Sequence, residues 1–241
     1  DGEGIPPDFF TDKDLRKAFA WAFDYEAFLR DSFKGTAQRA RGPVPPGIAG
    51  HDPKGKHYTH DLAKAAEYFK KAWGGKVWEK GFRFTLTYNT GSELRQTSCE
   101  ILKRNVESLN PKFRVDIRGV DWPSFVDKAQ RQLMPLFARG WTADYPDAHN
   151  FVFPFYHSQG RYASAQGYRN LELDKKVEAA VREVDPVKRA KLYKDILRLG
   201  YEEVPSIQTV HPPGVYGLRE WVKGFYDNAV FMGIYFYPLS K

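Results

Sequence analysis

Residues 139–147 read Arg-Gly-Trp-Thr-Ala-Asp-Tyr-Pro-Asp and follow a short apolar run, residues 133–138. The apolar run predicts a buried strand, and Gly140 and Pro146 bracket a turn-rich loop after it. In an α/β sheet, ligands usually bind where strands end. At that place the loop offers an indole, a carboxylate and a phenol, from Trp141, Asp144 and Tyr145.

A carboxylate beside aromatic rings suits one end of a zwitterion. Its oxygens accept hydrogen bonds from an ammonium group, and the ring faces add cation–π attraction. We therefore expect a cleft that binds the amino end of a peptide. The sequence leaves an alternative open, in which Trp141 and Tyr145 belong to the core and Asp144 caps the next helix.

The composition is that of a globular protein able to bury a core, since 42% of its 241 residues are hydrophobic and 28% are charged. The net charge of +7 would suit nucleic acid, but basic and acidic residues are interspersed, so we expect no nucleic-acid partner. Cys99 is the only cysteine, and His57 with His60 is too weak a pair for a metal site. We expect neither cofactor nor metal.

The residue pattern predicts three strands separated by two helices. Strands are expected over residues 82–88, 113–117 and 134–140, and helices over residues 92–110 and 122–133. This order predicts a mainly parallel sheet. Further helices are expected after a capping box that starts at Thr11, and over residues 24–33, 60–73, 171–184 and 186–201. Residues 150–156 are expected to cover one end of the sheet, and the aromatic tail, residues 225–237, needs a covering surface.

Four parts of the chain resemble the peptide-binding proteins of bacterial ABC importers. The resemblance lies in residues 14–24 (the family's "VRxAhxxAID" helix), residues 42–47 (its Pro-rich loop), residues 122–125 with 140–147 (its "W..hh…GWxADYxDP" pattern), and residues 167–170, 185–189, 205 and 221–224 (its closing pattern). These matches span nearly the whole chain. The sequence is similar to the C-terminal half of the oligopeptide- and dipeptide-binding group, solute-binding protein family 5.

The resemblance implies an α/β, periplasmic-binding-protein-like (type II) fold with two lobes around a cleft. Residues 1–12 would be an inter-lobe crossover, and residues 13–206 the second lobe, with a mainly parallel sheet flanked by helices. Residues 207–241 would return to complete the first lobe.

The resemblance also implies where such a protein works. We expect a fragment of an exported receptor on the periplasmic or extracellular face of the membrane, with the signal and any lipid anchor outside this chain. Its partners would be a peptide ligand, the ABC permease of the inner membrane, and the missing N-terminal half of the same protein.

By the same resemblance, Asp144 would receive the α-ammonium of the ligand, and Trp141 would wall that pocket. Arg95 lies near the position where the family places a basic residue for ligand carboxylates, and its planar fork suits two oxygens. The alternative is that Arg95 pairs only with Glu93 or with solvent.

A departure from the family concerns the residue three places before Trp141. Some relatives carry a second arginine there, whereas this chain has Ala138 and places Arg139 one step later. Because neighbouring residues on a strand face opposite ways, we expect Arg139 to point to the other face.

Further ligand contacts are expected from residues near the two strand ends: Tyr88, Asn89, Thr90, Ala143 and Tyr145. Peptide receptors often pair with the main chain of the ligand as an added strand. Backbone groups of Asn89, Thr90 and the Ala143 region are the candidates for that pairing.

Two other functions remain open. In a sugar or oligosaccharide receptor of the same fold, Trp141 would stack on the ligand and Asp144 would accept its hydroxyl groups. In a hydrolase, Asp144, Asp147 and His149 would supply acid–base groups. No nucleophile elbow, Cys–His pair or phosphate loop accompanies them, so we do not expect an enzyme.

Overall fold

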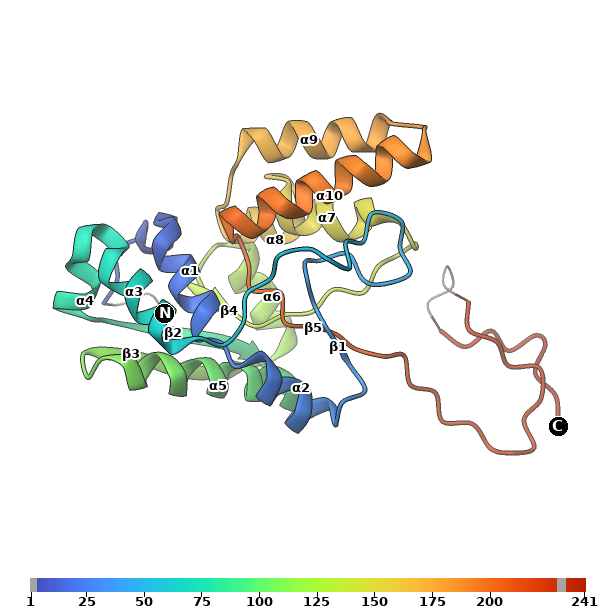
Figure 1. The fold of residues 1–241 in the computed structure, drawn as a ribbon. Helices are drawn as coiled ribbons and strands as arrows, with labels where there is room; N and C mark the ends of the chain where they lie inside the picture. The colour runs from blue at the N-terminus through green and yellow to red at the C-terminus, as the bar shows by residue number, and fades with distance from the viewer. Residues whose placement is uncertain (1–3, 229–232) are drawn as a thin grey trace.

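The fold is α/β, with a small parallel sheet and its helices beside a layer of further helices (Figure 1). The structure is a computed structural model that describes residues 4–228 and 233–241. Its elements in chain order are η1 (Phe9–Thr11), α1 (Lys13–Ala22), α2 (Tyr25–Phe33), β1 (Gln38–Arg39), α3 (Leu62–Lys71), η2 (Ala72–Gly75), α4 (Lys76–Lys80), β2 (Phe82–Asn89), α5 (Glu93–Leu109), β3 (Phe113–Val120), α6 (Trp122–Gln130), β4 (Leu136–Phe137), α7 (Ala148–Tyr156), α8 (Arg161–Ala165), α9 (Leu171–Arg182), α10 (Pro186–Glu203) and β5 (Val210–His211).

The main sheet has three parallel strands in the order β3-β2-β4. β2 pairs with β3 along its whole length, and with β4 only through Leu136 and Phe137. The predicted parallel sheet is therefore confirmed, with α5 and α6 as its connections. β4 is shorter than the predicted strand, because after Ala138, whose N–H still donates to Thr87 O at 2.9 Å, the chain leaves the sheet.

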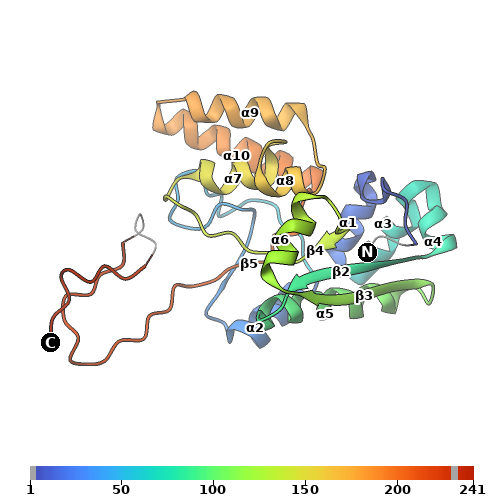
Figure 2. The same ribbon diagram turned by 180° about the vertical axis from the view of Figure 1, so that it is seen from behind.

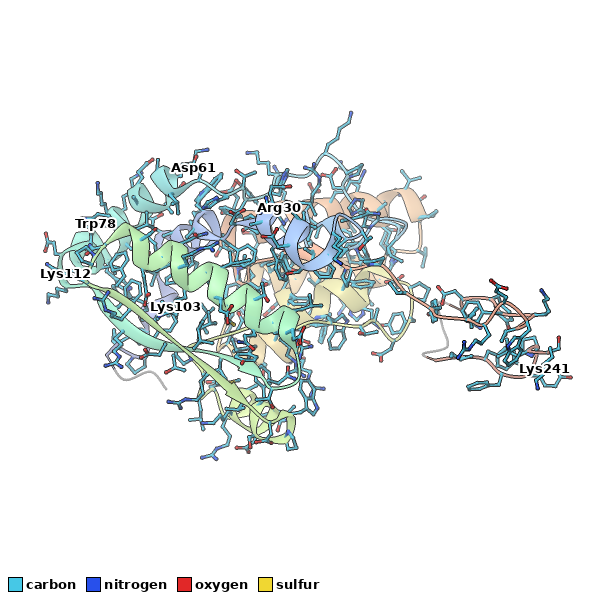
Figure 3. The ribbon with its side chains drawn as sticks, turned by 90° about the horizontal axis from the view of Figure 1, so that it is seen from below. Arg30, Asp61, Trp78, Lys103, Lys112 and Lys241 are labelled. Carbon is cyan, nitrogen blue, oxygen red and sulfur yellow. The ribbon has the colours of Figure 1, made fainter. Side chains whose placement is uncertain are left out.

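An aromatic core joins this sheet to the helices around it. Phe82 and Phe113 are directly paired across β2 and β3, and their rings stack with centroids 4.4 Å apart. Phe69 of α3 lies 4.9 Å from the ring of Phe113, and Phe19 of α1 lies 5.2 Å from Phe69. The alternating apolar residues of the strands thus bury their rings against α1 and α3, and Cys99 of α5 is buried in the same core. Lys103 of α5, labelled in Figure 3, is half-buried and donates to Val115 O of β3 at 2.6 Å.

Short polar side chains begin most of the long helices. Asp24, Asp61, Ser92 and Asp185 each accept a hydrogen bond from a backbone N–H of the first turn. The expected capping box at Thr11 is wrong by one residue: Asp12 caps α1, and the Thr11 hydroxyl instead donates to Asp8 O at 2.7 Å.

Helices α7 to α10 form a second layer with its own core, uppermost in Figure 1. The helical hairpin predicted from the sequence is confirmed as α9 and α10. Residues 150–156, expected to cover a sheet end, belong to α7, which packs on α8 and α9. α10 approaches α7 closely at Gly200, where a Cβ atom would lie 2.4 Å from the ring of Tyr156.

The described residues from about 212 onward extend away from this body as an arm that ends at Lys241 (Figures 1 and 3). It leaves the body at the two-stranded antiparallel ribbon of β1 and β5. Phe236 and Tyr237 in the arm are 72% and 88% exposed, so the expected covering surface is not supplied by the described residues. Phe231 of the aromatic tail lies outside the described residues. Within the described ranges, no helix combines the length and apolar character needed to cross a bilayer.

Candidate ligand-binding site

The loop of residues 139–147 is fastened at its start by two side-chain hydrogen bonds. Tyr162 OH, from α8, donates to Gly140 O at 2.6 Å. Trp141 Nε1 donates to Asn150 Oδ1, on α7, at 3.1 Å. The Trp141 ring is half-buried and meets the Tyr162 ring edge-on, with centroids 5.6 Å apart. The indole is therefore held in one orientation.

The end of the loop is fastened through Asp147. Its Oδ1 accepts from the backbone N–H of His149 at 2.8 Å, so Asp147 caps α7. Arg189 of α10 donates to both carboxylate oxygens at 2.8 Å each. These hydrogen bonds from Arg189 hold the pKa of Asp147 below its usual value. The alternative in which Asp144 caps the next helix is wrong, because Asp147 does so.

Asp144 lies between these two anchors and is exposed. Within residues 4–228 and 233–241, no hydrogen bond or ion pair engages its carboxylate. Ala143 beside it is half-buried, and Tyr145 is 44% exposed, with its hydroxyl 3.2 Å from His149 Nδ1. A free carboxylate on an anchored loop can accept hydrogen bonds from an incoming cation with little reorganisation.

Arg95 and Arg139 gather around the ring of Trp122 at the start of α6. Their guanidinium carbons lie 5.8 and 5.1 Å from its centroid. Arg95 also donates to Asn89 Oδ1 and not to Glu93, so its polar partner is neutral. The expectation that Arg139 points to the face opposite Ala138 is confirmed. Ala138 packs against the aromatic core, whereas Phe137 packs on Phe125 and the Arg139 guanidinium carbon lies 5.9 Å from the Phe125 centroid.

Some of the other residues expected to contact the ligand already use their hydrogen-bonding groups within the protein. The Thr90 N–H donates to Val120 O at 2.7 Å, so it is not free to pair with a ligand. Asn89 Nδ2 donates to Thr90 O at 3.0 Å, and its Oδ1 holds Arg95. Tyr88 is half-buried.

All these residues lie at one edge of the sheet, where β2, β3 and β4 end. Figure 2 shows the tip of β2 beside α6, which carries Trp122. Parallel strands place their carboxyl ends at the same edge, so Arg95 lies near the start of the 139–147 loop despite their separation in sequence: a Cβ atom at Gly140 would lie 3.7 Å from Arg95 Nη2. Tyr162 and Arg139 belong to this group but were not among the expected contacts. Trp122 occurs in a family pattern, whereas nothing near Tyr162 in the sequence marks it.

Among the described residues, no hydrogen bond joins the side chains of Asp144, Asp147 and His149 to one another. Asp147 is held in its ion pair with Arg189. His149 contacts Tyr145, and burial lowers the pKa of its imidazole. Among the described residues, no hydrogen bond joins His149 to Asp144.

The sequence profile of a known family, "Bacterial extracellular solute-binding proteins, family 5 Middle", matches residues 6–163. The chain belongs to this family. It is 23% identical over 219 residues to the probable D,D-dipeptide-binding periplasmic protein DdpA of Escherichia coli (strain K12), covering 90% of this chain and 41% of that protein. It is 26% identical over 199 residues to the oligopeptide-binding protein OppA of Bacillus subtilis (strain 168), covering 79% of this chain and 35% of OppA.

Solved structures share the fold. The periplasmic binding protein DppA from Helicobacter pylori, in complex with the peptide STSA, has a TM-score of 0.80 at 22% identity, covering 90% of this chain and 41% of that one. A dipeptide-binding protein from Pseudoalteromonas sp. SM9913 in complex with Met-Leu has a TM-score of 0.79 at 22% identity, and the match covers 96% of this chain and 46% of that one. The predicted type II periplasmic-binding-protein fold is thus confirmed, and the chain spans about 40% of the length of these relatives.

Proposed function

We propose that this chain is one lobe of an extracytoplasmic peptide receptor of an ABC importer, in which Asp144 accepts the α-ammonium of the ligand. The observation that carries the proposal is the free carboxylate of Asp144 on a loop whose two ends are both anchored. Family membership and relatives named for peptide binding support it.

The charges along the sheet edge suit a zwitterion. Asp144 offers a negative pole beside Trp141, and Arg95 offers a positive pole beside Trp122. A peptide presents an ammonium at one end and a carboxylate at the other, so both ends would find a partner. Ala143 and Tyr145 would line the amino end, and Tyr88 and Asn89 the carboxyl end.

The rest of the proposed receptor follows from the family. Residues 13–206 form the second lobe, residues 1–12 cross between lobes, and residues 207–241 complete a first lobe contributed by an N-terminal half. The exposed aromatic arm supports this, because such side chains need a partner surface. Ligand would close the two lobes by hinge motion, and the closed form would deliver the peptide to a membrane permease without chemical change.

The test is calorimetry on the two-lobed protein with Ala-Ala and with N-acetyl-Ala-Ala. Replacing Asp144 by Asn should weaken Ala-Ala binding by about 2–5 kcal/mol, roughly 30- to 5,000-fold in Kd. N-acetyl-Ala-Ala should bind the parent about as weakly as Ala-Ala binds D144N, because it lacks the ammonium that Asp144 accepts. For the same reason, D144N should weaken the binding of N-acetyl-Ala-Ala little further.

Asp195→Asn is the matched control. Asp195 is a 42% exposed side chain on α10 that pairs with Arg198, and its replacement should leave Kd unchanged. If D144N binds Ala-Ala as tightly as the parent, Asp144 does not receive the ammonium. If the parent binds oligosaccharides and no peptide, the sugar-receptor alternative holds. Turnover of either ligand would identify an enzyme.

A further inference from the structure

The Trp122 ring has two arginines around it, and neither has an acidic partner among residues 4–228 and 233–241. Arg139 lies with its guanidinium carbon 5.1 Å from the Trp122 centroid and 4.9 Å from that of Tyr162. Arg95 approaches from α5: a Cβ atom added at Gly140, next to Arg139, would lie 3.7 Å from Arg95 Nη2. Both side chains are half-buried.

Their charges are not compensated within the described residues. The hydrogen-bond partner of Arg95 is the neutral Asn89 amide, and Arg139 Nε is buried with no hydrogen-bond partner. Other half-buried arginines of this chain are satisfied. Arg189 binds a carboxylate at two points, and Arg39 donates to four backbone carbonyls. What distinguishes Arg95 and Arg139 is that both adjoin one ring and that, among the described residues, Arg139 Nε has no acceptor at all.

The surroundings make this excess of positive charge unfavourable. Burial lowers the pKa of both Arg95 and Arg139. For Arg139, Tyr162 opposes this effect, whereas repulsion from the neighbouring Arg161 and Arg95 lowers the pKa further. Arginine nevertheless keeps its proton at neutral pH. Anions placed between these groups would relieve the repulsion and supply the missing acceptors.

We propose that Arg95 and Arg139 together bind two carboxylates of the ligand, so that the receptor prefers peptides whose carboxyl-terminal residue is Asp or Glu. This inference rests on the proposed peptide-receptor function. One terminal carboxylate balances one guanidinium, and an acidic side chain balances the second. The planar fork of each arginine suits two-point contact with a carboxylate.

The distances indicate a short ligand. The Tyr162 ring touches Trp141 on the ammonium side, with centroids 5.6 Å apart, and Arg139 on the carboxylate side. A single aromatic ring therefore separates the wall of the proposed ammonium pocket from the nearer arginine. A dipeptide or tripeptide fits this spacing better than a long peptide.

The test compares Ala-Glu with Ala-Gln, which differ in charge and hardly in shape, by calorimetry on the two-lobed protein. We expect Ala-Glu to bind about tenfold or more tightly, because a charge-assisted contact is roughly twice as strong as a neutral one. The preference should shrink as salt is raised from 20 to 500 mM. Arg139→Gln should reduce the ratio of the two affinities to about one, and Arg139→Lys should keep part of it.

Arg198→Gln is the matched control, because Arg198 is 75% exposed on α10, and it should leave the ratio unchanged. Thermal unfolding of each variant confirms that the folded protein is compared. Equal affinity of the parent for Ala-Glu and Ala-Gln would overturn the inference and leave the peptide receptor intact. An Arg139→Gln protein that keeps the full ratio would also overturn it. If neither peptide nor Ala-Ala binds, the proposed function itself fails.

Discussion

Replacing Arg189 with Met should release the end of the loop that presents Asp144. Arg189 donates to both oxygens of Asp147 at 2.8 Å and to Ala180 O, on α9, at 3.2 Å. It also lies 3.1 Å from Tyr193 OH. Met keeps most of the apolar stem and supplies no donor, so the substitution tests the polar contacts by themselves.

The structure sets the size of the effect. The two side chains are 23% and 33% exposed, so the pair lies between a buried and a surface ion pair. Hydrogen bonds to charged groups contribute about 1.5–3 kcal/mol each when buried, and exposed pairs about 0.2–1 kcal/mol. We therefore expect R189M to lower the free energy of unfolding by about 1–3 kcal/mol.

The same pair should give the protein part of its acid sensitivity. Arg189 holds the folded-state pKa of Asp147 below the unfolded value of about 3.9. The resulting stability is complete above that unfolded value and is lost as the pH falls through the folded pKa. Without Arg189 the folded pKa moves back toward 3.9, so R189M should lose less stability than the parent on acidification.

Urea unfolding at pH 7 and at steps down to about pH 2.5 measures both effects. Arg198→Met, an exposed position on the same helix, is the control and should change the free energy of unfolding by less than about 0.5 kcal/mol. The reasoning is refuted if R189M is as stable as R198M at pH 7, or if its acid dependence equals that of the parent.

Two further predictions concern packing and protonation. Gly200→Ala should lower the free energy of unfolding by about 1–3 kcal/mol, because the new methyl group would lie 2.4 Å from the Tyr156 ring. A melting temperature equal to that of the parent would contradict this prediction. Burial lowers the pKa of His211, on β5, to about 4, below the unfolded value of about 6.5, so its protonation favours the unfolded chain. The contribution of His211 to the free energy of unfolding should therefore be complete above about pH 6.5 and should be lost as the pH falls toward 4. In urea unfolding at a series of pH values, His211→Leu should lose less stability than the parent over this range. An unchanged pH dependence of the free energy of unfolding would show that His211 does not cause the loss.

Local patterns were sufficient to predict most of the secondary structure. The alternation of Phe82, Phe84 and Leu86 predicted β2, and the helical hairpin of α9 and α10 was predicted around Asp185. Both depend on residues close in sequence. The α1 cap was misplaced by one residue, because Thr11 and Asp12 are both good caps, and the side-chain contact that decides between them cannot be read from residue types.

The candidate site was predictable only in part. The sequence marked the Trp141 and Asp144 loop, since a turn-rich segment after an apolar strand is recognisable locally. It did not show that Thr90 already uses its N–H in the sheet. It also could not tell which carboxylate of the loop is free. That depends on Arg189, which reaches Asp147 from a helix 42 positions later in the chain.

The sequence by itself determined the parallel β-α-β-α-β order, the helical hairpin and the polar loop after the third strand, because each follows from the spacing of apolar and turn residues. Only the tertiary structure decided which charges are satisfied. In the part of the chain that the structure describes, Asp147 is paired and Asp144 is left free because α10 brings Arg189 to Asp147. Arg139 joins Arg95 at Trp122 because the end of β4 and the starts of α5 and α6 pack at one edge of the sheet. Ion pairing depends on distances in space, and distances between remote segments are set by packing rather than by spacing along the chain.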